Sequence, residues 1–135
     1  MRVLSILFVW LSLSGSSSHA AKNHEYALVF LMQSSCPYCH IVAPSITHVS
    51  RQLGLTIYTF TLDGGGLPGF QVPIPVTQTI REKFLSVSNV VPATFLINVN
   101  SQKFTPISRG EVDYATLYRG LSNALNDPEV RKALQ

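Results

Sequence analysis

The chain contains two cysteines, Cys36 and Cys39, which are separated only by Pro37 and Tyr38. Two thiols at this spacing can form a disulfide with each other and can exchange it with thiols and disulfides of other molecules. A purely structural disulfide is not expected here, because structural disulfides stabilise a fold chiefly by closing longer loops. Cys36 and Cys39 are therefore the candidate catalytic pair, and thiol–disulfide exchange is the chemistry that they indicate.

The segment before this motif has the pattern of a buried strand followed by a turn. Tyr26–Met32 is a continuous apolar run, which is typical of a strand that is buried on both faces. The polar stretch 33–35 predicts a turn, and a helical period then begins at Cys36 and ends at Gly54. The apolar stripe of this predicted helix consists of Val42, Ile46, Val49 and Leu53. A Cys-x-x-Cys motif in this strand–turn–helix context is a strong indication of a redox site.

The start of a helix is a favourable place for a reactive sulfur. Unpaired N–H groups and the positive end of the helix dipole face Cys36 there, and both favour the thiolate over the thiol. Pro37 suits the first turn, because no helical hydrogen bond is lost at that position. Cys39 lies one turn further along and should be more buried, so we expect Cys36 to attack and Cys39 to resolve the mixed disulfide. Pro37 and Tyr38 are predicted to line the substrate-binding surface.

The motif also has two other interpretations. Cys36, Cys39 and His40 also match the attachment motif of c-type haem, although a buried strand before the motif and alternating strands and helices after it argue against haem. A structural zinc site would need two further ligands, and the chain has no second cysteine pair. We therefore predict no cofactor and no metal. His40 either tunes Cys36 or simply faces solvent, and the second alternative is favoured.

The rest of the chain alternates strands and helices. Further strands are predicted at 55–62, 93–99 and 103–107, and further helices at 77–85 and 114–126, with Thr77 and Asp113 as N-caps. The proline-containing stretch 67–76 is predicted to be an irregular loop, and 129–135 a frayed or short helical tail. The result is a β-α-β-α-β-β-α order. It predicts an α/β fold with a mixed four-stranded sheet, in which the first two strands are parallel and the last two form a hairpin.

Pro92 gives a second indication of function. Val91 and Pro92 precede the third predicted strand, which should lie beside the active-site turn in this topology. A cis proline at this place would leave the backbone of Val91 free to pair with an extended substrate. An ordinary trans proline at a strand start is the alternative. The topology favours the first interpretation, so Val91 and Pro92 are predicted to bind substrate.

The N-terminus has the pattern of a secretory signal peptide. Arg2 is followed by the apolar run Val3–Leu13, and small residues precede a cleavage position after Ala20. The run is short for a membrane anchor, although an uncleaved anchor is the alternative. We predict a leader at 1–20 and one mature domain at 21–135. The formal net charge is only +3 and no Lys/Arg cluster occurs, so nucleic-acid binding is not supported.

Several stretches carry a resemblance to a known family. They are Phe30–Gln33, Cys36–His40, Thr61–Gly64, Val72–Pro75 and Thr94–Asn100. Together with the order of elements, they resemble the thioredoxin fold and, more closely, the TrbB-type thiol-disulfide isomerases of F-type conjugative transfer systems. The similarity covers about Leu28 to Asn100, and it is weaker up to Ala124.

The resemblance implies a periplasmic protein that assists the folding of disulfide-containing proteins of the conjugation apparatus, together with a membrane or periplasmic redox partner. We expect a monomer, because dimeric isomerases usually carry a separate dimerisation domain. Family members have a longer segment between leader and first strand than the few residues between Ala20 and Tyr26. Thioredoxins also keep a buried acid at the position of Phe30. The alternatives are a dedicated thiol reductant, such as one serving cytochrome c maturation, and a non-enzymatic scaffold or holdase.

Overall fold

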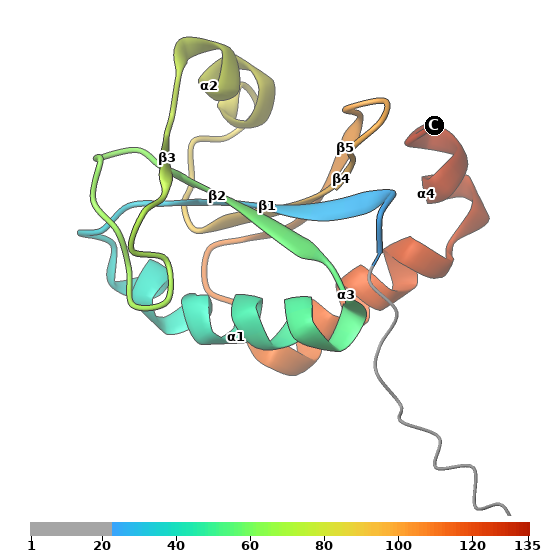
Figure 1. Cartoon of the computed structure of the whole chain (residues 1–135), viewed down its shortest axis with the longest axis horizontal. Helices are drawn as coiled ribbons and strands as arrows, with labels where there is room; N and C mark the ends of the chain where they lie inside the picture. Colours follow the sequence, from blue (N-terminus) through green and yellow to red (C-terminus); the bar gives the residue numbers. More distant parts are fainter. Residues whose placement is uncertain (1–22) are drawn as a thin grey trace, which may run out of the picture.

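The computed structural model describes residues 23–135, so the predicted leader at 1–20 lies outside the described residues. The described part alternates strands and helices along the chain (Figure 1). Its elements are β1 (Tyr26–Met32), α1 (Pro37–Leu53), β2 (Thr56–Thr61), β3 (Ile74–Pro75), α2 (Gln78–Leu85), β4 (Ala93–Asn98), β5 (Phe104–Arg109), α3 (Tyr114–Asn126) and α4 (Pro128–Ala133).

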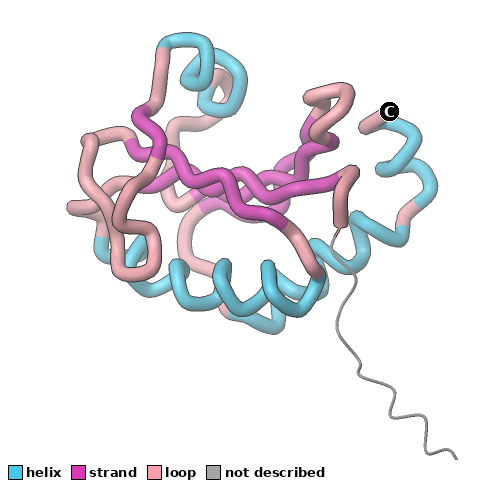
Figure 2. Tube along the Cα trace, in the orientation of Figure 1, coloured by secondary structure: helices cyan, strands magenta, loops and turns pink. Residues whose placement is uncertain are grey.

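The strands form one mixed sheet in the order β3-β2-β1-β4-β5. β1 is central: it runs parallel to β2 and antiparallel to β4, and β4 forms the predicted antiparallel hairpin with β5. All seven residues of β1 are buried, as the continuous apolar run predicted. The sheet separates α1 and α3 on one side from α2 on the other (Figures 1 and 2).

One glycine and two polar side chains at the predicted positions mark the ends of helices. Gly54 ends α1 in the left-handed conformation, with φ of 66°. The Thr77 hydroxyl accepts a hydrogen bond from the Ile80 N–H at 3.2 Å at the start of α2. The Asp113 carboxylate accepts one from the Thr116 N–H at 2.7 Å at the start of α3. The predicted caps of these three helices are therefore confirmed.

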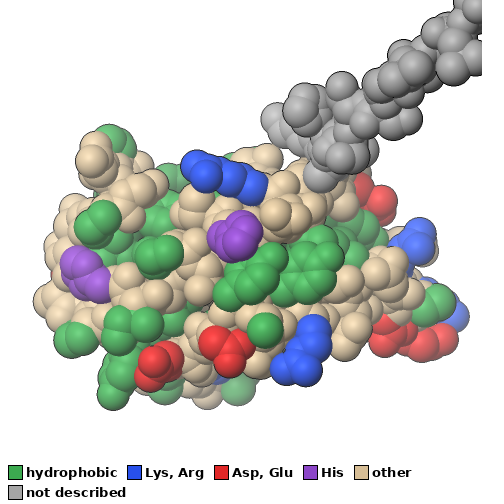
Figure 3. Space-filling view, turned by 90° about the horizontal axis from the view of Figure 1, so that it is seen from below, with side chains coloured by type: hydrophobic (Ala, Val, Ile, Leu, Met, Phe, Trp, Pro, Cys, Tyr) green, Lys and Arg blue, Asp and Glu red, His purple; other side chains and the backbone are tan. Residues whose placement is uncertain are grey.

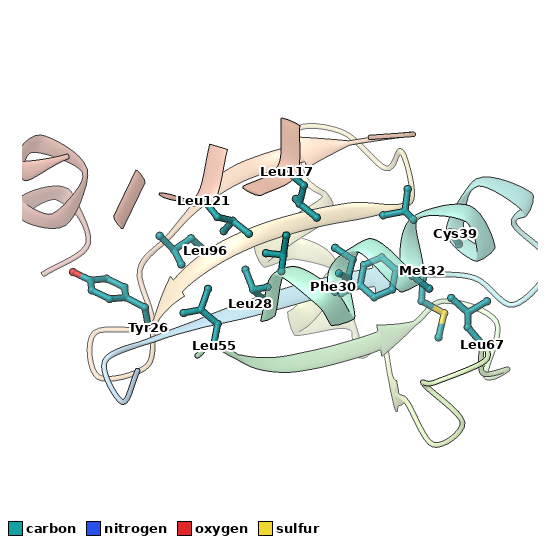
Figure 4. Close-up of a cluster of buried hydrophobic side chains, with 14 of the residues drawn as sticks. Tyr26, Leu28, Phe30, Met32, Cys39, Leu55, Leu67, Leu96, Leu117 and Leu121 are labelled. Atoms are coloured by element: carbon teal, nitrogen blue, oxygen red, sulfur yellow. The ribbon is translucent and has the colours of Figure 1, made fainter. Parts of the chain in front are cut away.

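Buried apolar side chains form one cluster on each face of the sheet. The larger cluster lies under α1 and α3, and Figure 4 shows that it contains Cys39 at the same end as Phe30 and Met32. The smaller cluster lies on the α2 side and is centred on Phe84 and Phe95, whose ring centroids are 5.1 Å apart. Cys39, the second cysteine of the motif, is thus packed in the core together with side chains of the central strand.

The prediction of four strands is wrong, because the described sheet has five. The additional strand, β3, lies in the stretch 67–76 that was predicted to be an irregular loop. It pairs in parallel with the end of β2, and the Val76 N–H donates to Thr61 O at 2.9 Å. Pro75 has no N–H to donate, but an edge strand tolerates proline because its outer side needs no partner. The predicted helical tail is α4, whose N-cap is Asp127.

The outer surface of the α1 and α3 side carries charged side chains singly or in small groups. Figure 3 shows Lys and Arg side chains scattered over this face, with apolar side chains gathered near its middle. This face therefore has no continuous basic surface.

Among the helices of residues 23–135, none combines the length and the apolar character that crossing a membrane requires.

Candidate redox site

Cys36 lies between the turn that follows β1 and the first residue of α1. It is the N-cap of the helix, with extended backbone angles, and the Cys39 N–H donates to its Sγ at 3.2 Å. Pro37 occupies the first helical position and costs no hydrogen bond there. The sulfur therefore accepts a hydrogen bond from an N–H group in the first turn of the helix, as the sequence predicted. Cys36 is partly exposed and is a free thiol.

Cys39 has a different environment. Its side chain is fully buried, at 0 % exposure, in the cluster under α1 and α3. This burial, followed by the hydrogen bond with Cys36, raises the pKa of the Cys39 thiol to about 12. Burial has this effect because it disfavours the charged thiolate. Cys39 is consequently a protonated thiol at neutral pH, whereas the partly exposed Cys36 is the accessible sulfur of the pair.

The segment before β4 lies against the active-site sulfur. The Val91–Pro92 peptide bond is cis, as predicted, and the Cys36 thiol lies 3.9 Å from Val91 O. Pro92 is buried, and its carbonyl accepts a hydrogen bond from the Gly110 N–H at 2.7 Å. The structure thus brings Val91 and Pro92 beside Cys36, from 55 residues further along the chain.

Exposed apolar side chains lie on the two segments that meet at Cys36. Tyr38, in the first turn of α1, is 54 % exposed, and Ile41 is 55 % exposed on the same helix. Val90, next to Val91, is 49 % exposed. Pro37 is exposed as well. Of the predicted substrate-binding residues, Pro37 and Tyr38 are thus exposed, Val91 is partly exposed and Pro92 is buried. Ile41 and Val90 are further exposed apolar side chains on the same two segments.

Two side chains contact the turn before Cys36 without having been predicted to do so. The Asp63 carboxylate, in the loop after β2, accepts hydrogen bonds from the N–H and hydroxyl of Ser34 at 3.1 and 2.7 Å. His40, in α1, lies with Nε2 at 2.7 Å from Ser34 O. His40 is exposed, as favoured, but it also has this specific contact. The run of three glycines after Asp63 was the available signal for a close approach.

The Asp63 carboxylate accepts several hydrogen bonds from protein groups, and these stabilise its charged form. The hydroxyl and then the N–H of Ser34 hold the pKa of Asp63 well below its usual range, and the Gly65 N–H and the Thr61 hydroxyl act in the same direction. Asp63 is therefore an anion at neutral pH. Within residues 23–135, no three His, Cys, Asp or Glu side chains gather closely enough to hold a metal ion.

The family of the chain follows from a comparison over most of its length. Residues 18–120 match the family model described as TraF, F plasmid transfer operon protein. The chain belongs to the TraF family. The match includes the whole Cys36–Cys39 motif, the Asp63 loop and the Val91–Pro92 segment.

A relative from a bacterium is also similar to this TraF-family chain. Protein TrbB of Escherichia coli strain K12 is 34 % identical to it over 92 residues, which make up 67 % of this chain and 51 % of TrbB. The chain thus spans about half the length of the curated relative that it matches. The resemblance inferred from the motifs is confirmed by these two findings.

Solved structures establish the fold of this TraF-family chain. MTB dsbF, in its mixed oxidized and reduced forms, aligns with a TM-score of 0.54 over 73 % of this chain and 79 % of its own. The thioredoxin domain of a thiol-disulfide oxidoreductase from Bacteroides vulgatus aligns with the same TM-score over 76 % and 80 %. Sequence identity is 16 % in both cases, so the likeness concerns the fold. The predicted thioredoxin-like fold is confirmed.

Proposed function

We propose that this TraF-family protein is a thiol–disulfide oxidoreductase that works mainly as a disulfide isomerase through Cys36 and Cys39. The observation that carries the proposal is the contrast between the two thiols. Cys36 is partly exposed at a helix N-terminus and accepts the Cys39 N–H at 3.2 Å, whereas Cys39 is fully buried. The Cys36 sulfur is therefore accessible to a substrate, and the buried Cys39 sulfur can react only with Cys36.

The reaction begins when the Cys36 thiolate attacks one sulfur of a substrate disulfide. A bond forms between Cys36 Sγ and that sulfur, the substrate disulfide breaks, and the second substrate sulfur leaves as a thiolate. In isomerisation, another substrate thiolate attacks the mixed disulfide, forms a new substrate disulfide and restores the Cys36 thiolate. In reduction, Cys39 loses its proton, attacks Cys36 Sγ and releases the substrate sulfur as a thiol. Cys36 and Cys39 are then joined by a disulfide.

The environment of Cys39 favours isomerisation over reduction. Reduction requires the Cys39 thiolate, and the raised pKa of about 12 leaves only a small thiolate population at neutral pH. Phe30, fully buried, occupies the position where thioredoxins keep a buried acid that helps to move this proton. Slow attack by Cys39 prolongs the mixed disulfide, so that substrate thiols have time to exchange. A dedicated thiol reductant is the second candidate.

The surface around Cys36 suits a polypeptide substrate. Tyr38, Ile41 and Val90 are exposed apolar side chains on the two segments that meet at the sulfur, and Val91 presents a backbone carbonyl beside it. An extended chain could pair with backbone groups near Val91 while its apolar side chains cover this area. Incompletely folded proteins expose such side chains, which is when their disulfides need correction.

The predicted leader and the family support a proposal for the setting of the reaction. The leader predicted at 1–20 supports export to the periplasm, where protein disulfides form. The match to the F plasmid transfer operon family supports disulfide-containing proteins of the conjugative transfer apparatus as substrates. An isomerase must stay reduced, so a membrane or periplasmic redox partner is expected to return electrons to the pair.

Refolding of a scrambled protein tests the proposal. Purified, reduced protein is mixed with scrambled ribonuclease without added oxidant, and recovery of ribonuclease activity is followed. Recovery should be faster than with free glutathione, and Cys36→Ser should abolish the gain. Rapid insulin reduction together with no gain in ribonuclease recovery would establish the reductant instead. Full activity of Cys36→Ser in protecting unfolded proteins from aggregation, with no redox activity in wild type, would point to a scaffold or holdase.

A further inference from the structure

Ser34, two residues before Cys36, is held from two sides by groups of other elements. Its N–H and hydroxyl donate to the Asp63 carboxylate at 3.1 and 2.7 Å. Its carbonyl lies 2.7 Å from His40 Nε2. Every polar atom of this residue therefore has a partner, although Ser34 is only partly buried. We call these contacts the Ser34 clamp.

The Asp63 side of the clamp extends beyond Ser34. The same carboxylate accepts the Ser35 N–H at 3.3 Å, the Thr61 hydroxyl at 3.0 Å and the Gly65 N–H at 3.1 Å. It thus binds both N–H groups that directly precede Cys36 and ties them to the loop after β2. The loop packs tightly, since a Cβ atom added to Gly65 would lie 2.6 Å from Ser34 Cβ and would overlap with its hydroxyl.

The His40 side of the clamp joins the turn to α1. A carbonyl oxygen can only accept, so Nε2 of His40 must carry the hydrogen in this contact. The neutral Nε2–H tautomer and the imidazolium both satisfy that requirement. His40 lies four residues after Cys36 on the same helix, and the His40 N–H also bonds to Cys36 O at 3.3 Å. The turn is therefore attached to the helix at the point where the sulfur is presented.

We propose that Asp63 and His40 are positioning residues for Cys36, which act by fixing the turn 33–35 against the loop after β2 and the start of α1. This inference rests on the proposed function of the pair, because it assigns supporting residues to the same site. Neither side chain is needed for the exchange step itself. Their effect is on the position of Cys36 Sγ, which must stay 3.2 Å from the Cys39 N–H and beside Val91 O. Misplacement by about 1 Å can cost a large part of a rate.

Charge and position predict opposite effects for Asp63, which makes the inference testable. An anion near a thiol disfavours its thiolate, and Asp63 adds in this sense to the larger effect of burial on the pKa of Cys39. Removing the charge while keeping the shape, as in Asp63→Asn, should therefore speed thiol reactions if only charge mattered. The clamp predicts slower reactions, because the amide NH₂ group cannot accept a hydrogen bond and would face the N–H of Ser34 or of Ser35, depending on which carboxylate oxygen it replaces.

The test measures the reaction of reduced protein with bis(2-hydroxyethyl) disulfide, an uncharged probe that needs no protein substrate. Asp63→Asn and His40→Leu should each lower the second-order rate constant by about tenfold. His40→Gln keeps an N–H donor at a similar reach and should stay within about twofold of wild type. Ser34→Ala, which retains the backbone contacts, should fall in between. Circular dichroism and urea titration establish that each variant is folded under the assay conditions.

Asp127→Asn is the matched control. Asp127 is also an exposed aspartate that accepts a backbone N–H, from Glu129 at 2.9 Å, but it caps α4 at the other end of the molecule (Figure 1). Its rate constant should equal that of wild type. Rates that are unchanged or faster in folded Asp63→Asn and His40→Leu would overturn the inference, as would equal losses in His40→Gln and His40→Leu. The small probe reports on the clamp even if scrambled ribonuclease is not a substrate.

Discussion

Cys36 and Cys39 are three residues apart but occupy opposite environments. Cys36 borders solvent, Val91 O and the helix start, whereas Cys39 belongs to the apolar cluster under α1 and α3. The difference follows from helix geometry, because the N-cap residue remains outside the helix while the residue one turn later faces the core. The structure thereby separates an attacking sulfur from a resolving one within a single motif.

Alkylation of the reduced protein should distinguish the two thiols. Between pH 6 and pH 8, iodoacetamide should modify Cys36 and leave Cys39 as a thiol, because Cys39 is buried and its pKa is about 12 rather than 9.0. The raised pKa means that the Cys39 thiolate becomes populated only as the pH rises well above 9. Labelling of Cys39 in a Cys36→Ser variant should accordingly stay slow at neutral pH and rise with pH, because the burial that raises the pKa of Cys39 remains in that variant. Peptide mapping by mass spectrometry locates the adduct, and preferential labelling of Cys39 at pH 6 contradicts the assignment.

The residue-level site was only partly predictable. Cys36, Cys39 and Pro92 were found because motif spacing and strand order are visible in the sequence. The Ser34 clamp was not, since the stretches around Asp63 and His40 indicate the family but not which groups these side chains contact, and the contacts depend on how a loop and a turn meet. Nothing in a single sequence distinguishes an exposed histidine that faces solvent from one that donates to a carbonyl at 2.7 Å.

At the scale of elements, local signals predicted most of the fold. The continuous apolar run gave β1, and the helical stripe ending at Gly54 gave α1. β3 was missed because it has only two residues, one of them a proline, and both are exposed. Its pairing comes from the neighbouring strand β2, which supplies the carbonyl of Thr61. Such a strand depends on tertiary contacts, and the periodicity of its own residues carries no sign of it.

Two glycine substitutions should have opposite effects on stability. Gly65→Ala places a Cβ against Ser34, so the loop after β2 must move, and a loss of about 1–3 kcal/mol is expected. Gly120 lies inside α3, where a Cβ would be 3.4 Å from the Ile107 side chain, an ordinary contact. Gly120→Ala should therefore gain about 0.5–1 kcal/mol by reducing the flexibility of the unfolded chain. Urea unfolding of reduced protein measures both, and a Gly65→Ala variant as stable as wild type would contradict the close packing.

At the scale of the whole molecule, the sheet order explains why distant segments meet at one sulfur. β1 ends at the turn before Cys36, β2 runs parallel to it and ends at the Asp63 loop, and antiparallel β4 starts there after Pro92. Met32 pairs with Thr61, and Leu31 with Ala93, so three chain segments emerge side by side. The central strand thus positions the site, while the two apolar clusters on its faces keep that strand in place.

The complete molecule should form a stable covalent complex with its substrate when the resolving thiol is removed. Cys39→Ala retains the attacking sulfur and its helix-start setting, so the first exchange step proceeds and a mixed disulfide between Cys36 and the substrate accumulates. The variant should fold, because alanine replaces a buried side chain of similar character and leaves only a small cavity. Non-reducing electrophoresis with scrambled ribonuclease should show a band at the summed mass. This band should be several times stronger than in wild type, absent in Cys36→Ser and removed by dithiothreitol. An equally strong band in Cys36→Ser would mean that Cys36 is not the attacking thiol.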